Sequence, residues 1–219
     1  MAYPTVSKPY GLKPINLIGG LPFAGATRQR RIASGAGSIG FGDPLKFASD
    51  GTVVVTTETS TAPTTGFAGV FLGCTFVSSV TGQPTYSQSW TSGTSVKAGT
   101  YIVAYVAEDP NTLFQAVGVT ASLVVSTSTG FTYSDIGLNV ALVANTLNTT
   151  TGDSQQGLLV SSASTTLSLP MRIIDVVPDT AFDVSGTVYY PEVIVKFNAP
   201  YVNSGVIEGG HAYNNPTGL

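Results

Sequence analysis

Short apolar stretches separated by turn residues recur along most of this 219-residue chain. In "DPLKFASDGTVVVTTET", apolar and polar residues alternate on both sides of the dipeptide Asp50-Gly51. Because Asp-Gly tolerates the positive φ angles of a tight turn, this stretch predicts a β-hairpin. No stretch carries the period of a long amphipathic helix. The pattern predicts an all-β fold, an antiparallel β-sandwich or barrel whose body spans residues 43–200.

The first 42 residues differ from the rest of the chain in charge and in pattern. They contain five of the nine Lys and Arg residues and no acid, a local charge of +5, whereas residues 43–219 carry −8. Pro9, Pro14 and Pro22 exclude a long helix and disfavour a central strand. The segment is nevertheless too apolar for a solvated tail. We therefore expect residues 1–42 to form an extended N-terminal arm that covers its own domain or a neighbouring protein.

Composition bounds the remaining organisation. Charged residues make up 10% of the chain, against about 25% in an average soluble protein, which suits a surface that becomes part of an assembly. Residues 201–219 lose the strand pattern and gain Gly and Asn, which predicts a loop-like C-terminal tail. Cys74 is the single cysteine, so no intrachain disulfide can form. The absence of a signal peptide and of a long apolar run predicts synthesis in the cytoplasm and no membrane partner.

The residues that usually carry catalysis are sparse. His211 is the sole histidine and lies in the Gly-rich tail, where a nucleophilic triad would need a mobile segment to supply its base. Glu108 and Asp109 are adjacent carboxylates, but they precede Pro110 in a turn, where acids usually cap backbone donors. We therefore predict a protein that is not an enzyme and that needs no cofactor.

Metal and phosphate sites are also weakly supported. Asp175, Asp179 and Asp183 recur every four residues, a spacing that would align them on a helix, but Pro178 favours a strand followed by a loop. A calcium site formed by these oxygen ligands stays open as an alternative, although we predict no metal. The glycines of "GGLPFAG" and "GAGSIGFG" lack the Lys-Ser/Thr ending of a phosphate-binding loop.

The strongest basic cluster is "RQRR", with Arg28, Arg30 and Arg31. Nucleic-acid binding is one interpretation, but an acidic body would repel a phosphate backbone. Docking on an acidic protein surface also explains the apolar neighbours, so we predict docking and no direct nucleic-acid contact. The predicted binding residues of the arm are Leu17, Ile18, Leu21, Phe23, Arg28, Arg30 and Arg31.

Several stretches resemble the decoration (cement) proteins of tailed-bacteriophage capsids. The resemblance runs in order over most of residues 8–200 and contains no catalytic signature. The stretches that carry it are "YGLKPINLIGG", "FAGATRQRRIASG", "FGDPL", "GVFLGCTF", "PTYSQSW", "YVAEDPNTLFQA", "DIGLNVALV", "TTTGDSQQGL" and "LPMRIIDVV".

The resemblance implies a non-enzymatic virion structural protein, made in the host cytoplasm, that binds the outer surface of the mature capsid. Its β-rich body and extended arm would clamp neighbouring subunits of the major capsid protein, and the protein would form a homo-oligomer, a dimer or a trimer. Attachment through body and arm together would make the second contact intramolecular. Replacing the three arginines with Glu is then expected to weaken attachment while the body stays folded.

Two alternatives stay open at this point. A head-fibre or tail-associated adhesion module could bind host-surface glycans by stacking them on Tyr86, Trp90 and Tyr101. A hydrolase of host polysaccharide would need paired carboxylates, and the sequence offers few candidates.

Overall fold

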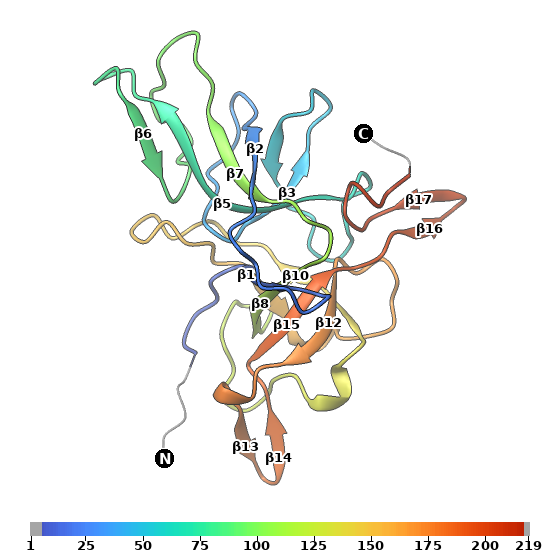
Figure 1. Cartoon of the computed structure of the whole chain (residues 1–219). Helices are drawn as coiled ribbons and strands as arrows, with labels where there is room; N and C mark the ends of the chain where they lie inside the picture. The colour runs from blue at the N-terminus through green and yellow to red at the C-terminus, as the bar shows by residue number, and fades with distance from the viewer. Residues whose placement is uncertain (1–5, 217–219) are drawn as a thin grey trace.

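Two large β-sheets, each packed on its own hydrophobic core, make up most of the molecule (Figure 1). The structure is a computed structural model and describes residues 6–216. The predicted all-β fold is confirmed, since helical structure within these residues is confined to three short 3-10 turns: η1 (Tyr133–Asp135), η2 (Val160–Ser162) and η3 (Pro178–Thr180). None of the helices in this range could span a membrane.

The first sheet curls into a nearly closed barrel, the barrel lobe. Its strand order is β10-β11-β8-β15-β12-β9, and β1 also pairs with β8. The two end strands, β9 and β10, are separated in the chain only by Ala141, so the sheet returns on itself. Pairing is antiparallel except between β11 and β8. The strands are β1 (Lys13–Leu17), β8 (Thr112–Val119), β9 (Asn139–Val140), β10 (Leu142–Val143), β11 (Gly157–Leu159), β12 (Met171–Val176) and β15 (Glu192–Phe197).

The second sheet forms the inserted lobe, at the top of Figure 1. Its order is β2-β7-β5-β3-β4, with β6 pairing on β5, and a parallel bridge between Ile32 and Val53 joins its two ends. The predicted hairpin at Asp50-Gly51 is confirmed, because Leu45 pairs with Val55 across it. The strands are β2 (Arg28–Arg31), β3 (Pro44–Phe47), β4 (Val53–Val55), β5 (Phe67–Val77), β6 (Pro84–Ser87) and β7 (Val103–Ala107).

The inserted lobe lies in the chain between β1 and β8, two strands that pair directly in the barrel lobe. The segment expected to be an extended arm, residues 1–42, therefore contributes one strand to each lobe, so residue 42 does not separate an arm from a body. Its apolar side chains explain this, because Leu12 and Ile32 are buried in the two cores. Both leader strands lie at sheet edges, where Pro14 is tolerated beside an irregular register. Residues 1–5 lie outside the described range.

The longest strand, β5, connects the two cores. Its first residue, Phe67, stacks on Phe197 in the barrel lobe with ring centroids 4.5 Å apart. Farther along β5, Phe71 and Cys74 are buried in the core of the inserted lobe. A single strand thus carries aromatic packing into both lobes.

Three of the stretches that carry the resemblance meet where the lobes join. The Gly11 N–H donates to the Gln156 carbonyl (3.1 Å), and the Leu12 N–H donates to the Gly42 carbonyl (2.9 Å). Gln156 also donates its side-chain Nε2 to the buried Asp43 carboxylate (3.1 Å). Gly11 has φ +77°, and a Cβ there would lie 2.6 Å from the Gly42 oxygen, so the close approach requires glycine.

Two hairpins and the C-terminal segment complete the fold. One hairpin projects from the barrel lobe, and the other begins the segment that was expected to be loop-like; they are β13 (Phe182–Val184) with β14 (Thr187–Tyr189), and β16 (Tyr201–Asn203) with β17 (Val206–Glu208). After β17, the chain pairs with β5, because the Phe67 N–H donates to Gly210 and the Ala212 N–H donates to Phe67. Residues 217–219 lie outside the described range.

Candidate binding surface

The predicted basic cluster forms β2, an edge strand paired with β7. Arg28 lies opposite Val106 and Arg30 opposite Ala104 in antiparallel register. Because side chains alternate along a strand, Arg28 and Arg30 share one side and Arg31 points to the other. The three arginines therefore do not act as one cluster.

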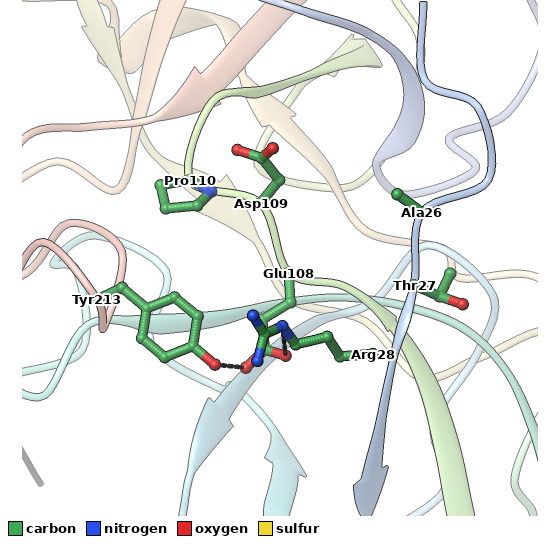
Figure 2. Close-up of a pocket in the computed structure, with 7 residues that line it drawn as sticks. All are labelled: Ala26, Thr27, Arg28, Glu108, Asp109, Pro110 and Tyr213. Atoms are coloured by element: carbon green, nitrogen blue, oxygen red, sulfur yellow. Dashed lines mark hydrogen bonds and ion pairs between the residues drawn. The ribbon is translucent and has the colours of Figure 1, made fainter.

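The side that carries Arg28 and Arg30 faces a buried carboxylate. Glu108, whose side chain is 1% exposed, accepts hydrogen bonds from Arg30 Nε (3.0 and 3.1 Å) and Nη2 (2.6 Å). Arg28 Nε lies 3.9 Å from the same carboxylate, and the Tyr213 hydroxyl donates to it. Figure 2 shows Arg28 and Tyr213 reaching Glu108 from opposite sides. Arg30 is thus committed to an internal ion pair.

A cleft of about 410 Å³ opens over this ion pair. Its lining comes from the leader, from the turn after β7 and from the C-terminal segment: Ala26, Thr27, Arg28, Glu108, Asp109, Pro110 and Tyr213. Hydrogen bonding to Glu108 raises the pKa of Arg30, so that side chain stays charged. Burial, and then the nearby Glu108 carboxylate, raises the pKa of Tyr213. Arg28 is the accessible cation of the cleft, because its side chain is 69% exposed.

Arg31 lies on the other side of β2. Its guanidinium stacks over the ring of Tyr101, 3.7 Å from the centroid, and both residues line a second cleft with the Asp50-Gly51 turn. Such cation–π contacts hold a guanidinium in place without neutralising it. Arg31 is therefore available to a partner, but on a different surface from Arg28.

The apolar part of the predicted site is a tight turn that follows β1. Ile18 and Leu21 are 49% and 64% exposed. The turn is held to the barrel lobe, because the Ile18 N–H donates to the Asn111 carbonyl (2.9 Å) and Phe23 packs against the core. The Leu17 N–H donates to the Leu21 carbonyl (2.7 Å), which closes the turn. Two apolar side chains are therefore presented to solvent on a fixed backbone.

The turn and the cleft are neighbours, because Asn111 directly follows the Asp109–Pro110 wall of the cleft. We call Ile18, Leu21 and Arg28 the leader surface. Of the other predicted binding residues, Leu17 is half-buried and Phe23 packs on the core. The pairing of Arg30 with Glu108 was not predicted from the sequence. A signal was present, since Glu108 directly follows the apolar strand β7, where an acid needs a partner.

No family model, curated protein or solved structure matches this chain. Assignment of a function therefore depends on the site geometry and on the sequence resemblance.

The structure places the other predicted candidates apart from one another. Within residues 6–216, no group of three or more His, Cys, Asp or Glu side chains could hold a metal ion. Asp175 and Asp183 instead accept hydrogen bonds from backbone N–H groups of their own segments.

The predicted stacking platform for glycans is also not assembled. Trp90 is only 5% exposed and packs edge-on against Phe76, so it cannot form a stacking platform with the exposed Tyr86.

His211 is buried where the C-terminal segment crosses the barrel lobe. Its Nδ1 accepts the Tyr213 N–H (3.2 Å), and its ring lies 6.0 Å from the ring of Phe197. Burial lowers the pKa of His211 to about 4. The neutral imidazole therefore helps fix the segment that carries Tyr213 to the cleft.

We expect the protein to lose stability on acidification because of His211. Its pKa is about 4 in the folded protein and 6.5 when unfolded, so the unfolded chain binds the extra proton between these values. The free energy of unfolding should be highest above pH 6.5 and fall by up to about 3 kcal/mol towards pH 4. Urea unfolding at pH 7.5, 6, 5 and 4.5 measures this loss.

The matched variant is His211→Asn, whose side-chain oxygen can still accept the Tyr213 N–H but does not titrate. Its stability should depend less steeply on pH in the same window. Asp43, whose pKa is raised by burial, acts with the opposite sign but is common to both proteins. Equal pH dependence in the two proteins would contradict the assignment to His211.

Proposed function

We propose that this chain is a non-enzymatic virion structural protein that binds the outer surface of a mature phage capsid. It stabilises the shell by clamping neighbouring subunits of the major capsid protein. The observation that carries the proposal is the leader surface, where exposed Ile18 and Leu21 lie on an anchored turn that adjoins the cleft lined by the exposed Arg28. The resemblance to capsid decoration proteins supports the same conclusion.

The energetics of this surface suit a docking role. Covering an exposed apolar side chain releases about 25 cal/mol per Å² of buried area. The anchored backbone lowers the entropy lost on binding, because the turn is already ordered. Arg28 can pair with an acidic group of the partner, whereas Arg30 cannot leave Glu108 without leaving a buried charge uncompensated.

A double substitution, Ile18→Asp with Leu21→Asp, tests the proposal. Mature capsids stripped of the protein are mixed with it, and bound protein is quantified by co-sedimentation. We expect the variant to bind at least about tenfold more weakly, a loss of about 1.4 kcal/mol, because two charges replace the apolar contact. Both side chains are exposed, so the fold should be retained.

The matched control is Val80→Asp, which places a charge on a different hairpin at a residue that is 87% exposed. This variant should bind capsids like the parent protein. If the double variant and the parent protein bind capsids equally well, the leader surface is not the docking site. No binding by the parent protein would overturn the proposed function, and a positive glycan array would then favour the adhesion module.

A further inference from the structure

A third cleft, of about 290 Å³, lies on the outer face of the barrel lobe. It is formed where the leader, β8, β15 and the lobe junction meet, and its lining residues are Tyr10, Lys13, Phe41, Gln115, Asp153 and Glu192. None of these belongs to the leader surface. The cleft is therefore separate from the surface proposed to bind the capsid.

Strand alternation places its polar groups. Phe114 on β8 and Val193 on β15 point into the core, so Gln115 and Glu192 point outward. Lys13 is the register partner of Gln115 on β1 and lies on the same outer face. Asp153 is brought to this face by a parallel bridge with Phe41 at the lobe junction.

Two carboxylate oxygens of the cleft remain available to accept a hydrogen bond. Glu192 is only 5% exposed, and its Oε1 accepts from both the Tyr10 hydroxyl and Gln115 Nε2 (2.9 Å). Its Oε2 has no partner among the described residues. Asp153 is half-buried, and its Oδ1 accepts from Gln88 Nε2 (2.6 Å) while Oδ2 is unpaired within residues 6–216. Neither oxygen is among the fully buried polar atoms that lack a partner within residues 6–216, so both are open to the cleft and can accept a hydrogen bond from a donor supplied from outside.

Charge and shape narrow the donor to one class. Two carboxylates and one ammonium give the cleft a net charge of −1, and Lys13 forms no ion pair within the described range. Tyr10 and Phe41 add aromatic side chains to the lining. A guanidinium is planar, carries only donors, pairs with carboxylates in a fork and stacks on aromatic rings. A saccharide hydroxyl can also donate to a carboxylate, but it carries no positive charge to balance the net charge of the cleft.

We propose that this cleft binds the guanidinium group of an arginine side chain presented by a partner protein. Glu192 Oε2 and Asp153 Oδ2 accept its N–H groups, and Tyr10 and Phe41 contact its plane. The inference goes beyond the proposed function and does not depend on it, because it assigns a second site on a different surface.

The test uses the full chain, labelled with ¹⁵N, and two small probes in NMR titrations. The probes are Nα-acetyl-L-arginine amide and its neutral isostere Nα-acetyl-L-citrulline amide. We expect the arginine derivative to bind with a millimolar Kd, to shift the side-chain amides of Gln115 and Gln88, and to bind at least tenfold more tightly than the citrulline derivative. Equal affinity for the two probes, or no shift with either, would overturn the proposal.

Variants locate the binding. Glu192→Gln should weaken binding of the arginine derivative at least fivefold. Asp179→Asn, which removes one charge outside the cleft, should leave the affinity for this derivative unchanged. Lys13→Gln should tighten binding, because it removes the repelling ammonium. If Glu192→Gln does not fold, Asp153→Asn serves instead, since its amide oxygen can still accept from Gln88.

Unchanged affinity for the arginine derivative in a folded Glu192 or Asp153 variant would contradict the site. Binding of methyl glycosides without binding of the arginine derivative would also contradict it. These titrations contain no capsid, so a negative result does not affect the proposed capsid binding. A negative result in the co-sedimentation experiment likewise does not affect the proposed guanidinium site.

Discussion

Replacing Arg30 with alanine is expected to lower the free energy of unfolding by about 3–4 kcal/mol, because removing one partner of a buried ion pair leaves the other charge uncompensated. The partner is Glu108, whose side chain is 1% exposed and accepts from both Nε and Nη2 of Arg30. Tyr213 would keep its hydrogen bond to Glu108, but a hydroxyl does not supply a positive charge. Urea unfolding at pH 7.5 measures the loss.

Arg28→Ala is the matched control, because it removes the same residue type from the same side of β2. Its Nε lies 3.9 Å from Glu108 and its side chain is 69% exposed, so the expected loss is below about 1 kcal/mol. The double variant Arg30→Met with Glu108→Leu should recover most of the stability, since neither charge then remains buried. A loss of less than 1 kcal/mol for Arg30→Ala would show that Arg30 is not needed to balance Glu108.

This difference between neighbouring arginines changes how the electrostatic part of capsid binding should be tested. The sequence suggests replacing all three arginines with Glu. In the structure, Arg30→Glu would place two carboxylates together in a buried site, so weaker binding could follow from unfolding alone. Arg28→Glu isolates the charge of the leader surface.

Local sequence signals predicted the local structure well. Asp50-Gly51 predicted a hairpin because the dipeptide determines the turn, and the flanking alternation determines which residues pair. The leader prolines predicted that no central strand would form there, and both leader strands lie at edges. These features depend on residues within a few positions of one another, which a sequence displays directly.

Long-range pairing could not be predicted in the same way. The Arg30–Glu108 ion pair joins residues 78 positions apart, and the bond between Tyr213 and Glu108 joins residues 105 positions apart. The change of charge at residue 42 suggested an arm and a body, but charge does not determine which strand an edge strand pairs with. The C-terminal segment loses strand period, yet Asn215 and His211 fix it through side-chain hydrogen bonds to backbone groups. Such contacts leave no periodic signal.

Replacing Phe197 with alanine is expected to cost about 4 kcal/mol, because it leaves a cavity among closely packed rings. Phe197 is 3% exposed, stacks on Phe67, and packs against Phe114 and His211. For a chain of this length the melting temperature should fall by roughly 8–16 °C. Differential scanning calorimetry measures the shift, and Val80→Ala, at an exposed hairpin, should leave the melting temperature almost unchanged.

The shape of the same transition reports how the lobes depend on each other. β5 carries Phe67 into the barrel core and Phe71 into the core of the inserted lobe, and the inserted lobe interrupts the chain between the paired strands β1 and β8. Loss of either core should therefore remove support for the other. We expect one transition in the parent protein, moved downward as a whole by Phe197→Ala and by a similar amount by Phe71→Ala. Two transitions, of which Phe197→Ala moves only one, would mean that the lobes unfold independently and that β5 does not couple them.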